Sequence, residues 1–129
     1  MTAHPASTER RVALLNDTSF YVGPALARAL AQRGHDLVIG DPVDGLAEEL
    51  RAIGAQVEVT GVRSLRTQDE ADALVNAAIG RFGRIDAAAV FSGDIVTGPF
   101  LASTDEQLQR VYKGCVEAPY HPRTTSFEP

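Results

Sequence analysis

The residues best suited to chemistry in this chain surround a polar turn, residues 16–22, between a short apolar run and a helix start at Gly23. Such a turn can bring backbone amides close to a phosphate at the helix N-terminus. Asp41 ends the next apolar run, where a carboxylate can accept hydrogen bonds from both hydroxyls of a ribose. These positions predict a nucleotide site. The simpler alternatives are a packing role for Gly23 and a solvated turn for Asp41.

Other reactive side chains form no recognisable site. The three histidines are far apart in sequence, and none has a metal-ligand spacing with Cys115, so no metal site is predicted. Cys115 has no nearby base and falls on the apolar face of a predicted helix, which favours a buried small side chain over a nucleophile. Arg63 and Arg66 could attract a phosphate, although a solvated loop is the simpler interpretation.

The elements that must position these residues alternate between short apolar runs and amphipathic stretches. The predicted strands are residues 12–15, 37–39, 57–59 and 85–91. The predicted helices are residues 23–33, 43–53 and 67–82, with a fourth after residue 103. Capping boxes at residues 67–70 and 103–106 begin the last two helices, and glycines end the first three.

This alternation predicts an α/β fold with a parallel sheet and right-handed crossovers. We expect a Rossmann-like, three-layer α/β/α half-domain with strand order 3-2-1-4. The nucleotide-binding domain would span residues 11–118, after a disordered arm at residues 1–10. Pro119 and Pro122 are predicted to break the last helix and to leave an irregular tail at residues 119–129.

Composition excludes several classes of function. The chain has 129 residues, 44% of them apolar and 22% charged, which is ordinary for one globular domain. A net charge of -5 without a basic run argues against nucleic-acid binding. No apolar run approaches the roughly 20 residues that span a bilayer. The polar first ten residues lack the apolar middle of a signal peptide, so the cytoplasm is the expected location.

Residues 11–120 resemble the N-terminal part of the short-chain dehydrogenases/reductases. The strongest stretches are residues 23–34, 81–86 and 98–101, and their joint order and spacing are more specific than any one of them. The resemblance implies an oxidoreductase that transfers hydride between a nicotinamide dinucleotide and a carbonyl or alcohol carbon.

The phosphate turn departs from the family's pattern. Family members usually carry Thr-Gly-x-x-x-Gly-x-Gly after the first strand, whereas only the last glycine, Gly23, remains here. Asp17 replaces the first glycine and brings a negative charge toward the phosphates, and Tyr21 replaces the second and fills space that the cofactor needs. The resemblance places cofactor contacts in this turn at Asn16, Ser19, Tyr21, Val22 and Gly23.

The adenosine end keeps one acid of the family's pattern, but Ser64 replaces the acid that would meet the adenine amino group and is a weaker acceptor. Asp41 repels a 2′-phosphate and therefore favours NAD over NADP. The family's Asp-Val pair falls on Ser64 and Leu65, and its Asn-Asn-Ala-Gly stretch falls on residues 90–93, where Val90 and Phe91 are expected in the core. The further cofactor contacts that the resemblance implies are Asp41, Ser64, Leu65, Ser92 and Gly93.

The family's catalytic groups are missing from this sequence. Their tyrosine stands four residues before a lysine, but Lys113 is the only lysine here and no tyrosine precedes it at that spacing. The family's further asparagine falls on Cys115. No catalytic residue is therefore predicted.

Three hypotheses for the function remain. The first is a truncated or divergent oxidoreductase relative with weak or no NAD binding and no turnover alone. The second is a non-catalytic interaction subunit, as a homo-oligomer or with a complete relative, because an apolar edge strand at residues 87–91 can recruit another strand. The third is the start of a longer oxidoreductase.

Overall fold

The structure is a computed structural model that describes residues 10–91 and 96–126. Four short strands form one parallel sheet in the order β3-β2-β1-β4, which confirms the predicted α/β class and strand order. They are β1 (Val12–Leu15), β2 (Asp36–Gly40), β3 (Val57–Thr60) and β4 (Ala87–Ala89).

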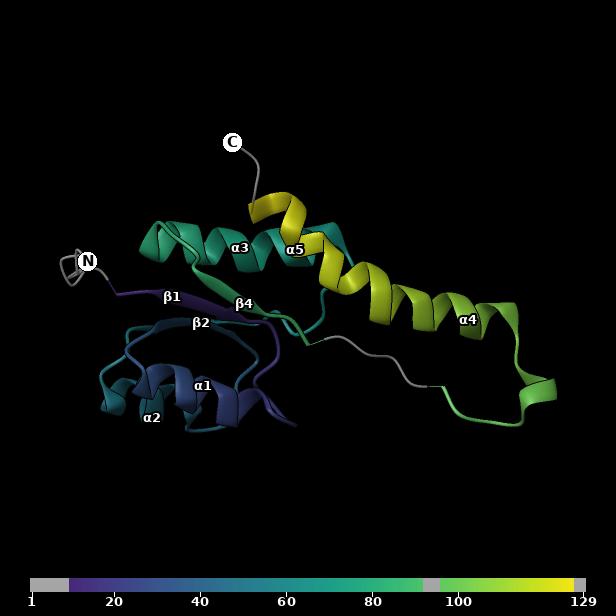
Figure 1. The fold of residues 1–129 in the computed structure, drawn as a ribbon, viewed down its shortest axis with the longest axis horizontal. Helices are drawn as coiled ribbons and strands as arrows, with labels where there is room; N and C mark the ends of the chain where they lie inside the picture. Colours follow the sequence, from purple (N-terminus) through teal and green to yellow (C-terminus); the bar gives the residue numbers. More distant parts are fainter. Residues whose placement is uncertain (1–9, 92–95, 127–129) are drawn as a thin grey trace, which may run out of the picture.

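Helices cover both faces of the sheet, so the domain has three layers (Figure 1). Helices α1 (Gly23–Gln32) and α2 (Leu46–Ile53) lie on one face. Helices α3 (Gln68–Phe82) and α5 (Ala118–Ser126) lie side by side on the other.

The central strand β1 is apolar throughout because each face of the sheet has its own core. Ala13 and Leu15 join the cluster beneath α1 and α2, whereas Val12 and Leu14 join the cluster beneath α3 and α5. All four side chains are almost completely buried, as expected for a parallel strand covered on both sides.

Of the two predicted capping boxes, one lies where the sequence predicts it and the other is shifted. Thr67 and Glu70 form the predicted reciprocal capping box of α3. The second box lies one residue later than predicted, because Thr104 and Gln107 cap α4 (Asp105–Tyr112) in place of Ser103 and Glu106.

The end of the chain differs from the prediction. Helix α4 continues through a π-helical turn, η2 (Lys113–Glu117), into α5, so the predicted irregular tail is wrong for residues 119–126. Pro119 falls in the first turn of α5 directly after the widened π turn, where its missing N–H is tolerated best. Packing against α3 and the loop before it also favours helix, since Ala118 is buried in the core beneath α3 and the Nδ1 atom of His121 lies 2.8 Å from the Leu65 carbonyl oxygen.

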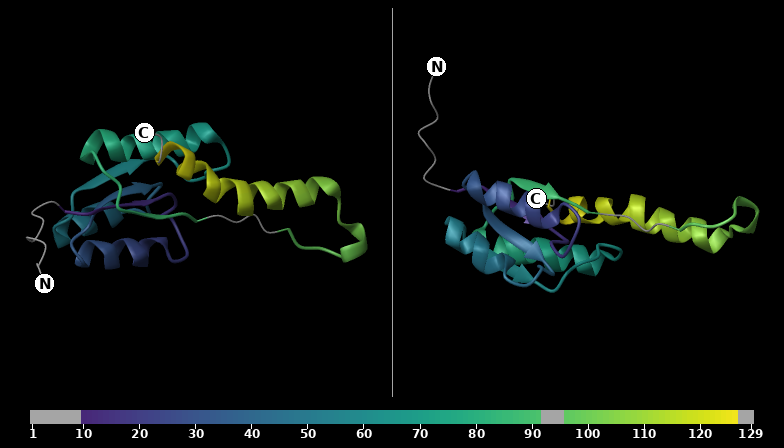
Figure 2. Two further views of the ribbon diagram at one scale, coloured as in Figure 1. Left: turned by 45° about the horizontal axis from the view of Figure 1, so that its top comes forward. Right: turned by 90° about the horizontal axis from the view of Figure 1, so that it is seen from below.

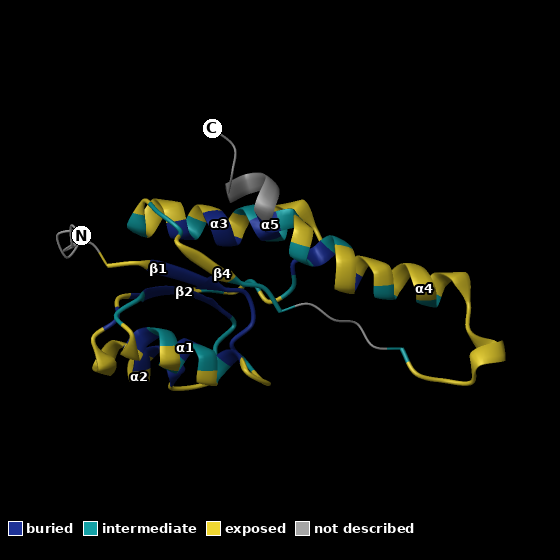
Figure 3. Ribbon diagram, in the orientation of Figure 1, coloured by how far each residue is buried: buried dark blue, intermediate teal, exposed yellow. Residues whose placement is uncertain are grey.

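Helix α4 projects away from the sheet together with the short 3-10 helix η1 (Phe100–Ala102) that precedes it (Figures 1 and 2). None of the α4 residues is buried (Figure 3). Cys115 is likewise exposed, so its predicted burial is wrong, because apolar spacing along a helix does not show whether another element covers it. Across the described ranges, no helix combines the length and apolar character needed to cross a membrane.

The arm that was predicted at residues 1–10 lies outside the described residues except for Arg10. The Nε atom of Arg10 lies 2.8 Å from Asp36 Oδ1 and pairs with it, so this residue belongs to the folded domain.

Asp86 fastens β4 to β1 and gives the fold a predicted pH dependence. Its carboxylate accepts two hydrogen bonds from the Arg84 guanidinium (2.8 and 2.6 Å) and one from the Val12 amide (2.8 Å). Against the opposing effect of burial, the Arg84 hydrogen bonds and then the Val12 amide lower the pKa of Asp86. A carboxyl group with a lower pKa in the folded state stabilises the fold above its unfolded pKa, and this stability is lost as pH falls through the folded pKa.

We expect Asp86→Asn to lower the free energy of unfolding by about 1 kcal/mol at neutral pH. The difference from wild type should shrink in acid, which denaturant unfolding across the acidic range measures. Glu49→Gln is the control, because its exposed pair with Arg28 (2.9 Å) is worth little. An equal, pH-independent loss in both variants would contradict the assignment.

Candidate nucleotide site

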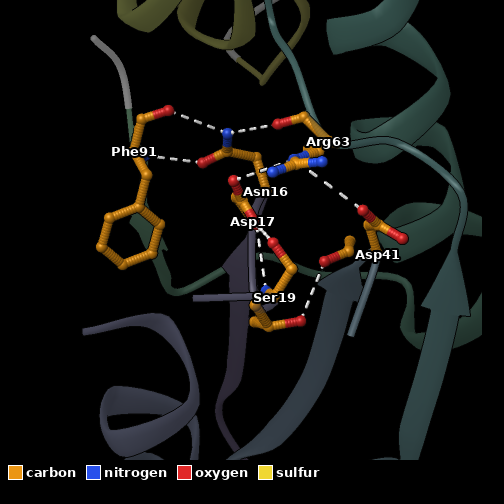
Figure 4. A network of polar contacts seen from close by, with 8 residues as sticks. Asn16, Asp17, Ser19, Asp41, Arg63 and Phe91 are labelled. Atoms are coloured by element: carbon orange, nitrogen blue, oxygen red, sulfur yellow. Dashed lines mark hydrogen bonds and ion pairs between the residues drawn. The ribbon is translucent and has the colours of Figure 1, made fainter. Parts of the chain in front are cut away.

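The candidate site lies at the carboxyl edge of the sheet. The strand order places β2 on one side of β1 and β4 on the other, so the order of connection reverses at β1. Open α/β sheets bind ligands in the crevice outside the carboxyl ends of their strands at such a point. The turn after β1, the end of β2 and the loop after β3 meet there (Figure 4).

Asn16 holds this edge together. Its side chain is 1% exposed, and its Oδ1 atom accepts a hydrogen bond of 2.6 Å from the Phe91 amide. Its Nδ2 atom donates to the carbonyl oxygens of Phe91 and Arg63, both at 2.9 Å. These bonds join the ends of β1 and β4 to the loop after β3. Asn16 therefore has a structural role, and its contact with a cofactor stays a prediction.

The turn after β1 is held by side-chain hydrogen bonds in place of the family's first glycine. Asp17 Oδ1 accepts from the amide (3.0 Å) and the hydroxyl (2.6 Å) of Ser19, which is the geometry of an Asx turn. The amide and hydroxyl of the buried Thr18 both donate to the Gly40 carbonyl oxygen, at 2.9 and 2.8 Å. The turn is thus anchored to the end of β2 with its own polar groups largely satisfied.

Gly23 lets α1 approach this turn closely. A Cβ atom at this position would overlap the Asp17 carbonyl oxygen and lie 3.0 Å from Thr18 Cα. The helix-packing interpretation of Gly23 is therefore supported directly, whereas its role in cofactor binding stays a prediction.

Tyr21 stands where the family has its second glycine, and its backbone conformation is unfavourable for a tyrosine. Its φ angle is 57°, in the left-handed region that glycine adopts most easily. Its side chain is 83% exposed and the neighbouring Phe20 is 60% exposed. Two bulky aromatic rings therefore stand at the mouth of the turn, where the family keeps space for a pyrophosphate.

Arg63 lies between the two acids of the edge. Its Nε atom is 3.5 Å from Asp17 Oδ2 and 3.8 Å from Asp41 Oδ2 (Figure 4). Its guanidinium carbon lies 5.8 Å from the centroid of the Phe20 ring. The charge that Asp17 brings to the turn is therefore offset by a cation, which the sequence interpretation of Arg63 as a solvated loop residue did not anticipate.

A hollow of about 380 Å³ opens beside this edge. It contains the predicted contacts Ser64 and Leu65, although Leu65 is 1% exposed and serves mainly in the core. The other predicted contacts within the described residues do not line it, namely Asn16, Ser19, Tyr21, Val22, Gly23 and Asp41. The lining residues are Asp17, Phe20, Arg63, Ser64, Leu65, Arg66, Phe91, Gly114 and Ala118.

Two predicted contacts, Ser92 and Gly93, lie outside the described residues. Sequence reasoning missed the η2 and α5 residues Gly114 and Ala118, because they come from a helix whose return to the sheet no local pattern indicates. Arg63 carried a usable signal, since it stands three residues after the end of β3 and carboxyl ends of parallel strands share one edge. Among the described residues, no three His, Cys, Asp or Glu side chains gather to hold a metal ion.

Comparison of sequences finds relatives among oxidoreductases. An uncharacterized oxidoreductase of Mycobacterium tuberculosis is 33% identical over 108 residues, which cover 81% of this chain and 39% of the relative. No family model matches the chain.

Comparison of structures finds the same fold. A 3-oxoacyl-[acyl-carrier protein] reductase from Brucella melitensis has a TM-score of 0.80 and 28% identity, covering 93% of this chain and 50% of its own. A 3-oxoacyl-[acyl-carrier protein] reductase from Brucella melitensis in complex with NAD has a TM-score of 0.79 and 28% identity, covering 93% of this chain and 49% of its own. A putative dehydrogenase from Burkholderia cenocepacia with bound NADP, at 24% identity and a TM-score of 0.76, covers 89% of this chain and 46% of its own, and shares the fold.

The chain thus spans about half the length of these solved structures and 39% of the Mycobacterium tuberculosis relative. The order of strands and helices, the candidate site at the carboxyl edge and these likenesses agree with one another. The chain accordingly resembles oxidoreductases of the short-chain dehydrogenase/reductase type in sequence and in fold.

Proposed function

We propose that this chain is the nucleotide-binding part of a short-chain dehydrogenase/reductase-type oxidoreductase, that it binds a nicotinamide dinucleotide weakly, and that it does not turn over a substrate alone. The observation that carries the proposal is the hollow beside the carboxyl edge, which Ser64, Leu65 and Phe91 line together. The Brucella melitensis relative was solved with NAD. A cytoplasmic location stays a prediction from the sequence.

Weak binding follows from the turn after β1. A pyrophosphate needs close approach to backbone amides, but Phe20 and Tyr21 stand exposed at that turn. The Oδ1 atom of Asp17 already accepts the Ser19 amide, which is one of the donors that a phosphate would use. The adenosine end of a dinucleotide would therefore supply most of the binding free energy.

Absence of turnover follows from the side chains that the sequence contains. The family's acid is a tyrosine whose pKa a neighbouring lysine lowers, and no tyrosine in this chain has a lysine four residues later. The single lysine, Lys113, is exposed at the start of η2. Mixing the 129-residue chain with NADH or NADPH and a panel of ketones should give no oxidation of the cofactor above background.

Tyr21→Gly tests the proposed binding site. Glycine tolerates the φ angle of 57°, so we expect the variant to gain up to about 1 kcal/mol in stability. Removing the ring should also open the turn and tighten NADH binding by about tenfold, which isothermal titration measures. Val22→Gly is the matched control for the stability gain, because its φ is −86° and glycine there adds only backbone freedom.

Failure of both wild type and Tyr21→Gly to bind NADH or NADPH at millimolar concentration would refute the binding proposal. Robust reduction of a ketone by the wild-type chain would refute the second part.

The second candidate is an interaction subunit, which one specific observation favours. Leu108, Tyr112 and Val116 are spaced four residues apart along α4 and η2 and are 64%, 49% and 51% exposed. Apolar groups in such a row are suited to burial against a second copy or a complete relative. Light scattering of wild type and Leu108→Arg tests this, since a wild-type chain that stays monomeric at high concentration would rule out self-association.

A further inference from the structure

The position of Arg63 between two acids bears on which dinucleotide the proposed site accepts. Both ion pairs run through its Nε atom, at 3.5 Å from Asp17 Oδ2 and 3.8 Å from Asp41 Oδ2. The side chains of Arg63 and Asp41 are 60% and 48% exposed, so this pair faces solvent. An incoming ligand can therefore reach both charges without unfolding the edge.

The terminal nitrogens of this guanidinium remain available. Within the described part of the chain, neither of them donates a hydrogen bond, and the group rests near the face of Phe20 at 5.8 Å. A guanidinium presents a planar fork of donors that matches two phosphate oxygens. Arg63 is thus a cation held in place from one side, with its phosphate-binding donors unused.

Asp41 is the acid that meets the adenosine ribose if a dinucleotide binds at this edge. Taken alone, it would repel a 2′-phosphate and select NAD, which is the preference expected from sequence. The structure places a positive charge 3.8 Å from that carboxylate. The contact between Arg63 and Asp41 joins Nε to Oδ2. The terminal nitrogens of Arg63 can therefore donate hydrogen bonds to a group on the ribose.

We infer that Arg63 determines specificity at the ribose and lets the site accept NADP as well as NAD. Arg63 binds the 2′-phosphate through its terminal nitrogens, while Asp41 retains its preference for the free hydroxyls of NAD. This inference rests on the proposed binding of a dinucleotide, and it replaces the simple NAD preference that Asp41 implies.

Titration of the 129-residue chain with NADH and NADPH, followed by cofactor fluorescence, tests this assignment. Wild type should bind the two within about tenfold of each other. Arg63→Gln should weaken NADPH relative to NADH by at least about tenfold, the loss expected for one charge-assisted contact. Arg63→Lys keeps the positive charge but loses the planar pair of donors. Its affinity for NADPH relative to NADH should therefore lie between those of wild type and Arg63→Gln. Asp41→Asn should shift the preference in the opposite direction, toward NADPH.

Arg81→Gln is the matched control. Arg81 also pairs through Nε with an exposed acid, Glu58, at 3.7 Å and lies 5.3 Å from the ring of Phe82, but it does not line the hollow. The ratio of the dissociation constants of Arg81→Gln for NADPH and NADH should equal that of wild type. If Arg63→Gln proves unstable in thermal unfolding, Arg63→Lys serves instead, because loss of the planar guanidinium should still weaken NADPH relative to NADH.

The outcomes separate the two levels of the proposal. If Arg63→Gln weakens NADH and NADPH equally, or wild type prefers NADH by more than about a hundredfold, Arg63 does not set specificity, although the dinucleotide site stands. If neither wild type nor Tyr21→Gly binds either cofactor, the proposed function fails as well.

Discussion

Replacing Gly40 by alanine should unfold the carboxyl edge and lower the free energy of unfolding by about 3 kcal/mol or more. Gly40 ends β2 directly beneath the turn that follows β1. A Cβ atom there would overlap the carbonyl oxygens of both Asn16 and Val62. These are backbone atoms of two different segments, so no side-chain rotation relieves the overlap. The strands would have to separate at the point where the candidate site is built.

Gly61→Ala is the control for this prediction. It lies in the loop after β3, has no atom within 4 Å of a built Cβ, and does not have a positive φ. Its free energy of unfolding should stay within about 0.5 kcal/mol of wild type in urea. Equal stability of the Gly40 and Gly61 variants would show that β1 and β2 do not approach each other this closely.

Replacing Asn16 by alanine should have an effect of similar size, about 3 kcal/mol. The change removes three hydrogen bonds and leaves the amide and carbonyl of Phe91 and the carbonyl of Arg63 without these partners. Buried polar groups that lose a partner destabilise the fold by about 1–3 kcal/mol each, and partial access of water reduces the sum. Binding at the edge should weaken too, because both Arg63 and Phe91 line the hollow.

Asn16→Asp separates hydrogen bonding from packing. The carboxylate has nearly the same size but cannot donate to the two carbonyl oxygens, so this variant should also be strongly destabilised. Ser64→Ala is the control, since the Ser64 hydroxyl only accepts one bond of 3.2 Å from the Arg66 amide in an exposed loop. A stable, wild-type-like Asn16→Asp would contradict the donor role assigned to Nδ2.

Much of the fold could be predicted from local pattern. Continuous apolar runs predicted strands covered on both faces, and Val12–Leu15 indeed contributes to two separate cores. The Thr67–Glu70 capping box predicted the start of α3 because its hydrogen bonds are made within one turn. Such signals succeed when the interactions that decide the structure join near neighbours.

The end of the chain could not be predicted in this way. Prolines at 119 and 122 predicted an irregular tail, but the π turn before α5 and the contact of α5 with α3 favour a helix. Likewise, the apolar spacing around Cys115 predicted a buried face, whereas α4 and η2 leave it exposed. Whether an apolar stripe is covered depends on elements far away in sequence.

For the candidate site, too, the sequence determined some features and the tertiary structure determined others. The sequence by itself determined the α/β class, the strand order and the placement of Asp17, Tyr21, Asp41 and Gly23 around a turn at the carboxyl edge. Only the tertiary structure decided what those residues contact: Asn16 bridges the ends of two strands, and Arg63 lies between Asp17 and Asp41. The physical reason is how far apart along the chain the interacting residues lie. Strands and caps arise from neighbours along the chain, whereas these polar contacts join residues more than 20 positions apart and form only when the sheet aligns its strand ends.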